Sequence, residues 1–536
     1  MAGVTGRRTF VKHASLAIAG ASASRWFRYA LADADSVVVP TAYGKVRGAL
    51  VDGVNIFKGI PYGASTAGKN RFMPPVKPAP WTDTRNALAY GPTAPQAVGR
   101  TRRNAPAEGE DCLVLNVFTP SLQNGPRRPV MVWLHGGGFS YGTGSQAILD
   151  GTSLAHSGDV VVVTINHRLG VFGYTYLGGA IGGEFATSGA AGMLDIVAAL
   201  QWVRGNIDRF GGDPNLVTIF GQSGGGRKVA TLMAMPSAKG LFHRAIIESG
   251  AVLRLVTVDD ATKTTELLLA ELGLRNDQAR ELQNVPMDKL LAADAAIAGK
   301  VTVREPGQTA NSPTVDGMLI PSHPWDPAAP ELSKDIPLMI GYARTEETLY
   351  DKPTPETLAL DEAGLMVRAR KRLGANPQRV IDAFRRAHRD ATPWDLWILI
   401  ATDYPRGAYA RETAKRKATQ GGAPAFLYRF DWETPEGGGH MRSPHTIEIP
   451  FVFNNIKIAG PLISKMPEAF ALAKKVSASW ASFARRGNPN TSALPIWPAY
   501  SADKRMTMLF NDDSRIEQDP DRGPRLAIER QLKLTT

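Results

Sequence analysis

One serine stands among glycines at residues 221–225, in the sequence Gly-Gln-Ser-Gly-Gly. The β-branched, apolar run 216–220 precedes it, and a helix-like segment begins at Arg227. A strand that turns into a helix through Gly-x-Ser-x-Gly makes a tight, strained turn, which exposes the serine hydroxyl at the amino end of the helix. The pattern therefore indicates that Ser223 is a nucleophile for acyl transfer, and we expect no phosphate-binding loop here.

A serine hydroxyl needs a base and an orienting acid to react near neutral pH. In the fold that carries this serine turn, the acid and then the histidine follow the serine in the chain. The histidines after Ser223 are His243, His323, His388, His440 and His445. His445 follows the expected strand 426–430 by a loop and leads into the segment 447–453 (IEIPFVF), whereas His440 follows three glycines, a flexible context for a group that must be held in place. We therefore expect His445 to be the base.

Two adjacent glutamates are candidates for the acid. The apolar run 337–340 ends in Gly341, and Glu346 and Glu347 follow on the next loop.

A second glycine cluster, at residues 136–138, follows the apolar run 129–134. Bare backbone amides at the end of a strand can donate to the oxyanion of a tetrahedral intermediate, so this cluster predicts an oxyanion hole.

The elements that must position these residues alternate between strands and helices. Short, almost continuously apolar runs are typical of strands buried on both faces of a parallel sheet. They lie at 129–134, 160–166, 216–220, 245–247, 337–340 and 426–430. Between them, residues 194–210 have apolar positions at helical spacing, and 252–310 and 352–420 are mostly helical in pattern. The sequence predicts an α/β fold with a large, mostly parallel central sheet flanked by helices.

Several further motifs resemble those of the type-B carboxylesterase family, which includes bacterial para-nitrobenzyl esterases and the cholinesterases. They are 57–62 (FKGIPY), 71–75 (RFMPP), 110–117 (EDCLVLNV), 166–170 (NHRLG) and 210–214 (FGGDP). The likeness covers roughly residues 36–530 and implies the α/β-hydrolase fold, with 33–536 as a single domain.

The resemblance also assigns roles to residues. The family's nucleophile matches Ser223, its acid matches Glu346 and its histidine matches His445. Its oxyanion donors match Gly137, Gly138 and Gly224, and a serine that supports the acid matches Ser249. The implied activity is hydrolysis of carboxylic esters through an acyl-enzyme. The alternative is a non-catalytic adhesion or scaffold module of the same fold, although such modules typically lose the nucleophile.

The chain departs from the family pattern at several positions. Gln222 stands where relatives usually have glutamate, so the negative charge beside the serine is missing, and Gly224 replaces the usual alanine. Cys112 matches half of a disulfide in eukaryotic relatives, but it is the chain's one cysteine. Residues 82–111 contain no tryptophan, so the platform on which cholinesterases stack quaternary ammonium is missing. We therefore expect short-to-medium acyl esters as substrates, with acetylcholine and long-chain triglycerides as poor ones.

Composition limits partners and cofactors. The net charge is +12, but the basic residues are mixed with acids, so we expect no nucleic-acid partner. No apolar run is long enough for stable membrane insertion. No metal or organic cofactor is implied, because a triad itself supplies the nucleophile and the base. The expected partner is a small-molecule ester, and the sequence predicts no particular oligomeric state.

The first 32 residues have the features of an export signal. Arg7 and Arg8 are followed by Phe10 and Lys12, and then by the small, weakly apolar run 14–24. The segment contains no acidic residue and ends in Ala-Leu-Ala. It resembles a twin-arginine signal peptide, which predicts export to the periplasm or medium.

Overall fold

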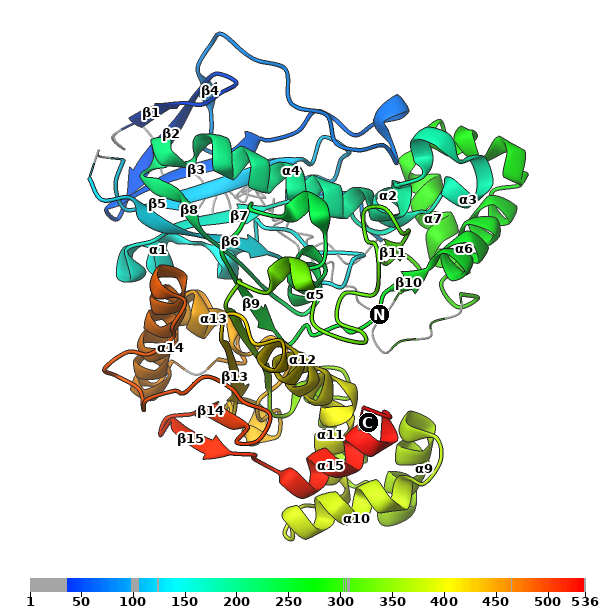
Figure 1. Cartoon of the computed structure of the whole chain (residues 1–536), viewed down its shortest axis with the longest axis vertical. Coiled ribbons are helices and arrows are strands. Elements are labelled where there is room, and N and C mark those ends of the chain that lie inside the picture. The colour runs from blue at the N-terminus through cyan, green and yellow to red at the C-terminus, as the bar shows by residue number, and fades with distance from the viewer. Residues whose placement is uncertain are drawn as a thin grey trace, which may run out of the picture.

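The computed structural model describes residues 36–534, apart from 98–105, 123–124, 302, 304, 306–308 and 464. The twin-arginine segment expected at 1–32 lies outside the described residues. A twisted sheet runs through the molecule, with helices on both of its faces (Figure 1). Within the described residues, no helix combines the length and the hydropathy that a membrane crossing requires.

The main sheet has 13 strands in the order β1-β2-β3-β5-β7-β6-β8-β9-β12-β13-β14-β15, with β4 paired to β2. The strands from β7 to β14 are parallel, and the strands at both ends pair antiparallel, except that β4 pairs with β2 in parallel. The strands are β1 (Ser36–Pro40), β2 (Lys45–Val51), β3 (Val54–Pro61), β4 (Arg85–Asn86), β5 (Val114–Thr119), β6 (Arg128–Leu134), β7 (Val161–Ile165), β8 (Gly212–Gln222), β9 (Arg244–Glu248), β12 (Leu338–Ala343), β13 (Ala425–Phe430), β14 (Met506–Phe510) and β15 (Arg515–Gln518). A separate parallel pair joins β10 (Val256–Thr257) to β11 (Thr314–Val315).

The central strands alternate their side chains between two apolar cores. Val130 and Val132 of β6 pack on one face with α4 and α5, whereas Met131 and Trp133 pack on the other face with α1, α13 and α14. The fully buried runs predicted from the sequence follow from this double coverage. The predicted helix at 194–210 is α4 (Ala191–Asn206), continued by a 3₁₀ turn at Ile207–Phe210.

Two further helical clusters flank the sheet (Figure 1). One contains α2, α3, α6 and α7, and the other contains α9, α10, α11 and α15. The helices are α1 (Thr152–Gly158), α2 (Gly170–Tyr174), α3 (Gly178–Ile181), α5 (Gly224–Leu232), α6 (Val258–Glu271), α7 (Met287–Ile297), α8 (Pro355–Leu358), α9 (Glu362–Leu373), α10 (Pro377–Ala387), α11 (Pro393–Thr402), α12 (Ala408–Thr419), α13 (Ile449–Val452), α14 (Pro467–Arg486) and α15 (Arg522–Gln531).

Candidate active site

Ser223 occupies the turn between β8 and α5. Its backbone is in the positive-φ region, with φ of +58°, and its N–H donates to the carbonyl of Glu248 at 2.8 Å. A Cβ at Gly225 would lie 1.9 Å from the carbonyl oxygen of Leu134, and one at Gly221 would lie 2.5 Å from the same atom. The two glycines are therefore required because the turn packs directly against the end of β6, and the serine is held at the amino end of α5 in a strained conformation.

The predicted oxyanion loop follows β6 and lies against the same turn. Gly137 and Gly138 have φ of +91° and +63°, and a Cβ on Gly224 would lie 2.1 Å from the carbonyl oxygen of Gly138. Within the described residues, the N–H groups of Gly137, Gly138 and Gly224 donate to no acceptor. Three unused backbone donors thus gather beside the serine, as the stabilisation of an oxyanion requires.

Glu346 and His445 meet at the same edge of the sheet. Glu346 follows β12, His445 lies on the loop after β13, and the Glu346 carboxylate contacts Nδ1 of the imidazole in a short hydrogen bond. The other carboxylate oxygen, Oε1, accepts the N–H of Ala343 at 2.9 Å. Both residues are almost completely buried, at 0% and 3% exposure. This bond sets Nδ1 as the protonated nitrogen, which leaves Nε2 free to act as a base.

Backbone bonds hold the two loops together. The N–H of His445 donates to the carbonyl of Glu346 at 3.2 Å, and the N–H of Thr345 donates to the carbonyl of Ser443 at the same distance. The Ser443 N–H donates in turn to the Thr345 hydroxyl at 2.8 Å, and the Ser443 hydroxyl donates to the carbonyl of Phe430. The imidazole is therefore positioned by the end of β13 and by the acid loop together.

Burial and neighbouring charges set the protonation of this pair. Burial lowers the pKa of His445, and the charges of Arg406 and Arg227 lower it further, against the opposing effect of Glu346. Burial alone would raise the pKa of Glu346, but His445 and Arg406 outweigh it and keep that pKa below its ordinary value. The resting state at neutral pH is thus a neutral imidazole beside an ionised carboxylate.

Ser223 and His445 are not hydrogen-bonded to each other. The side-chain amide nitrogen of Gln222 lies 3.3 Å from Nδ1 and 3.4 Å from Nε2 of the imidazole. Catalytic hydrogen bonds often tighten only when substrate is bound. Gln222 therefore places a neutral amide, not a carboxylate, beside the base.

Two more buried carboxyl groups lie behind the triad. The Ser249 hydroxyl donates to Glu448 at 2.8 Å, and hydrogen bonding by Ser249 also lowers the pKa of Glu346. Burial, followed by the charge of Glu346, raises the pKa of Glu448 to about 8. Burial and the charge of Glu448 also raise the pKa of Glu248, which accepts a bond from the Trp480 indole at 2.7 Å. Ser249 therefore links the acid to a carboxyl that is mostly protonated at neutral pH.

Glu347 and His440, the other residues considered for the acid and the base, do not contact the Glu346–His445 pair in this way. Glu347 pairs with Arg406 at 3.0 Å and with Arg372 at 3.7 Å, so its carboxylate faces away from His445. His440 is exposed on its glycine-rich loop. The structure thus brings together the serine, glutamate and histidine expected from the sequence, and it leaves the neighbouring candidates out.

Comparisons with known proteins place this geometry in a family. Residues 35–524 match the model of the carboxylesterase family. The chain is 38% identical to the para-nitrobenzyl esterase of Bacillus subtilis strain 168, and the match covers 90% of this chain and 96% of the relative. It is 33% identical to the phenmedipham hydrolase of Pseudarthrobacter oxydans, and that match covers 89% of this chain and 95% of the relative. The crystal structure of carboxylesterase EST55 from Geobacillus stearothermophilus at pH 6.2 superposes with a TM-score of 0.80 at 38% identity, covering 91% of this chain and 99% of that one. The chain belongs to the carboxylesterase family. It is a carboxylic-ester hydrolase with the α/β-hydrolase fold, and not a non-catalytic module.

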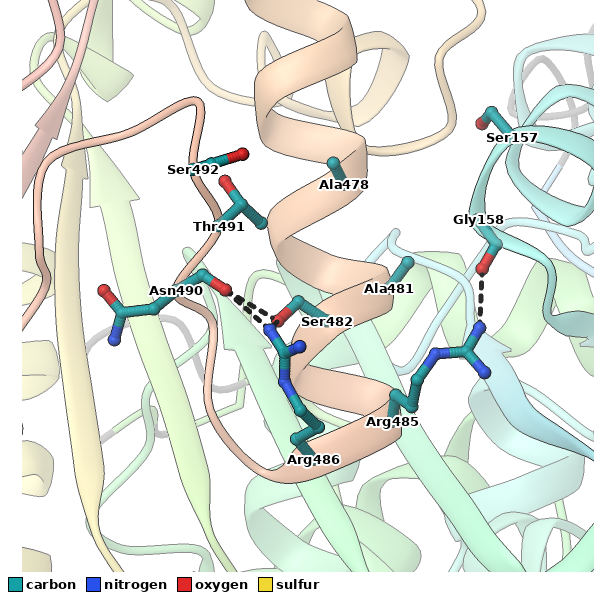
Figure 2. A pocket seen from close by; sticks show the side chains of 10 residues that line it. All are labelled: Ser157, Gly158, Ala478, Ala481, Ser482, Arg485, Arg486, Asn490, Thr491 and Ser492. Atoms are coloured by element: carbon teal, nitrogen blue, oxygen red, sulfur yellow. Dashed lines mark hydrogen bonds between the residues drawn. The ribbon is translucent and has the colours of Figure 1, made fainter.

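A groove on the carboxylesterase surface lies away from this site. It has a volume of about 480 Å³ and lies between α1, α14 and the segment after α14 (Figure 2). Its two arginines are engaged: Arg485 donates to the carbonyl of Gly158, and Arg486 donates to Ser482 and to the carbonyl of Asn490. The backbone carbonyl of Arg485 accepts a hydrogen bond from the guanidinium of Arg244, at the start of β9. The groove is therefore at the amino ends of the parallel strands, opposite the edge where the triad gathers.

Several residues that lie next to the candidate site are not predicted from the sequence. Glu448 lies three residues after His445, in the turn immediately before α13. Arg406 reaches Glu346 from the π-helical segment Asp403–Gly407 between α11 and α12, and no local sequence pattern indicates it.

Lys228 is a further residue that the sequence did not single out. It is completely buried on α5, where its ammonium donates to the carbonyl of His135, at the start of the oxyanion loop, at 2.9 Å. Burial lowers the pKa of Lys228 to about 7. The imidazole of His135 stacks on that of His167, with ring centroids 4.8 Å apart, and burial lowers the pKa of His135 to about 3. Lys228 thus connects the glycine loop at residues 136–138 to the helix that follows Ser223.

Proposed function

We propose that this carboxylesterase acts through Ser223, His445 and Glu346 by an acyl-enzyme mechanism. Ser223 Oγ attacks the ester carbonyl carbon while its proton moves to His445 Nε2. The imidazolium then gives that proton to the leaving alkoxide as the C–O bond breaks. Water repeats the sequence on the acyl-enzyme and releases the carboxylic acid. The observation that carries this proposal is the buried contact between Glu346 and His445 at the sheet edge where Ser223 sits.

The oxyanion is held by backbone amides in this proposal. The N–H groups of Gly137, Gly138 and Gly224 donate to no acceptor in the part of the chain that the structure describes, and they lie against the serine turn. Donors fixed before the reaction stabilise developing charge without a reorganisation cost. Ser249 supports the acid by hydrogen bonding between Glu346 and Glu448.

A labelling experiment tests the nucleophile. A fluorophosphonate probe should modify the enzyme stoichiometrically, and Ser223→Ala should abolish both the labelling and the hydrolysis of para-nitrophenyl butyrate. Ser157→Ala is a matched control, because Ser157 is an exposed serine on α1. Normal labelling of Ser223→Ala, with intact folding by circular dichroism, would disprove the assignment.

We propose short-to-medium acyl esters of aryl or alkyl alcohols as the substrates. The missing tryptophan in residues 82–111 argues against choline esters. The para-nitrobenzyl esterase relative supports aryl-type alcohols. A series of para-nitrophenyl esters from acetate to palmitate, run beside acetylthiocholine, should peak at short or medium chains. A maximum at laurate or longer, or acetylthiocholine ahead of butyrate, would contradict this.

We further propose that the enzyme is exported through a twin-arginine signal in residues 1–32. The paired arginines, the absence of acids and the small weakly apolar run support this. Changing Arg7 and Arg8 to lysine should retain precursor in the cytoplasm. Undiminished activity in the periplasm or medium would refute the signal.

A further inference from the structure

Arg227 stands one helical turn after the nucleophile. It is the fourth residue beyond Ser223, on α5, so the two residues lie on the same side of the helix. Side chains on a helix lean toward its amino end, which directs Arg227 back toward the serine. Its charge lowers the pKa of both His445 and Tyr350, and the rings of those two residues are 5.5 Å apart. Arg227 is thus one helical turn from Ser223, and its charge acts on both His445 and Tyr350.

No described residue accepts a hydrogen bond from the Arg227 guanidinium. Among the described residues it forms no ion pair with a carboxylate, and no side-chain hydrogen bond uses any of its N–H groups. The residue is partly buried, between the fully enclosed core and the surface. Arg406 makes the contrast, because it pairs with Glu347 at 3.0 Å and lies 3.9 Å from Glu346. An arginine with five unused donors beside a nucleophile is available to a ligand.

The charges around Arg227 leave a positive excess. Glu346 is matched by Arg406, and Glu347 is shared by Arg406 and Arg372. Glu448 lies behind the histidine in a mostly protonated form, and Gln222 puts a neutral amide beside the serine. Among the described residues, no ionised side chain thus neutralises the charge of Arg227. Position 222 also carries no carboxylate that would repel a bound anion.

We propose that Arg227 binds a carboxylate of the substrate, so that this esterase prefers esters that carry a carboxylate near the scissile bond, such as half-esters of dicarboxylic acids. The planar guanidinium matches a carboxylate in two parallel hydrogen bonds, and such pairs are among the stronger hydrogen bonds in proteins. This inference rests on the proposed function of Ser223, because it places the bound carboxylate one helical turn from that nucleophile.

Matched substrates test the preference on both sides of the ester. The acyl arm compares para-nitrophenyl valerate with para-nitrophenyl hydrogen glutarate, and the alcohol arm compares phenyl butyrate with 3-carboxyphenyl butyrate. The measured quantity is the ratio of kcat/KM for the charged ester to that for the neutral ester, which cancels any effect of a variant on both substrates. Arg227→Met should lower this ratio about 10-fold or more in at least one arm, mainly through KM. Arg227→Lys should retain part of it.

Two controls separate charge recognition from general damage. Arg370→Met removes an exposed arginine on α9 and should leave the ratio unchanged. In the unmodified enzyme the ratio should fall as salt is raised, and in Arg227→Met it should respond much less. A ratio that changes less than about 3-fold in both arms, with Arg227→Met folded to the same melting temperature, would overturn the proposal.

Failure of this inference is distinguishable from failure of the nucleophile assignment. Calorimetric binding of monobutyl glutarate to the Ser223→Ala enzyme should weaken when Arg227→Met is added, and this measurement needs no turnover. Retained hydrolysis by Ser223→Ala would refute the proposed function. An inactive Ser223→Ala enzyme with carboxylate binding that is independent of Arg227 would refute this inference alone.

Discussion

Replacing Glu346 with glutamine should disable catalysis by reversing the proton on His445. Glu346 Oε1 accepts the N–H of Ala343 at 2.9 Å, while Oε2 contacts His445 Nδ1. In Glu346→Gln the amide oxygen stays on the Ala343 N–H, because a buried N–H is costly to leave unpaired. The amide NH₂ then faces Nδ1, which must accept a hydrogen bond. The imidazole proton moves to Nε2, and that nitrogen can no longer take the proton of Ser223.

The expected loss is large because two effects act together. The wrong tautomer predominates, and the imidazolium that forms in the transition state loses its counter-charge in a site where both side chains are buried. The same change of acid to amide in the serine–histidine–aspartate template lowers kcat about 10⁴-fold, or roughly 5 kcal/mol. We expect a similar fall in kcat for Glu346→Gln, with KM little changed.

Glu347→Gln is the matched control. Glu347 pairs with Arg406 and Arg372, and all three side chains are partly exposed. Such pairs contribute about 1 kcal/mol or less, so kcat should stay within about 5-fold. The assay is steady-state hydrolysis of para-nitrophenyl butyrate, together with the rate of fluorophosphonate labelling. A larger loss in Glu347→Gln than in Glu346→Gln, or a Glu346→Gln enzyme within about 10-fold of the unmodified one, would refute this account.

Three further predictions follow from the same geometry. His445→Ala should lose as much activity as Ser223→Ala, while His440→Ala should keep most of its activity. Because burial lowers the pKa of His445, kcat/KM should fall only below the ordinary histidine pKa of about 6.5. A fall in kcat/KM that begins above neutral pH would contradict this pKa. Burial raises the pKa of Glu448 in the folded state to about 8, so its contribution to stability is present below the unfolded pKa of about 4.3 and is lost as the pH rises toward 8. The melting temperature of Glu448→Gln, relative to that of the unmodified enzyme, should therefore rise across this pH range. A constant difference between the two melting temperatures would argue against a protonated Glu448. Lys228→Met removes both a buried charge and the hydrogen bond to the His135 carbonyl. The value of kcat should therefore fall about 10-fold, while the melting temperature stays the same or rises. A variant that is less stable but keeps its full kcat would give Lys228 a purely structural role.

The sequence by itself determined the fold class and the identities of the triad candidates. The glycines around Ser223 are required because the turn packs against Leu134, and such a requirement leaves a local mark in the sequence. The apolar runs of the central strands carry a similar mark, since helices cover both faces of the sheet. The strand bounds were less accurate: the run 216–220 became β8, Gly212–Gln222, because pairing with β6 and β9 extends it in both directions.

Only the tertiary structure decided what surrounds the reacting groups. Glu346 and Glu347 are neighbours of the same type, but their surroundings differ: Glu346 is buried against His445, whereas Glu347 is paired with arginines from distant segments. Glu448, Arg406 and Lys228 act through contacts across many residues of sequence, and their protonation depends on burial, which no local pattern encodes. The guanidinium of Arg227, which has no acceptor among the described residues, likewise depends on tertiary contacts that no local pattern encodes.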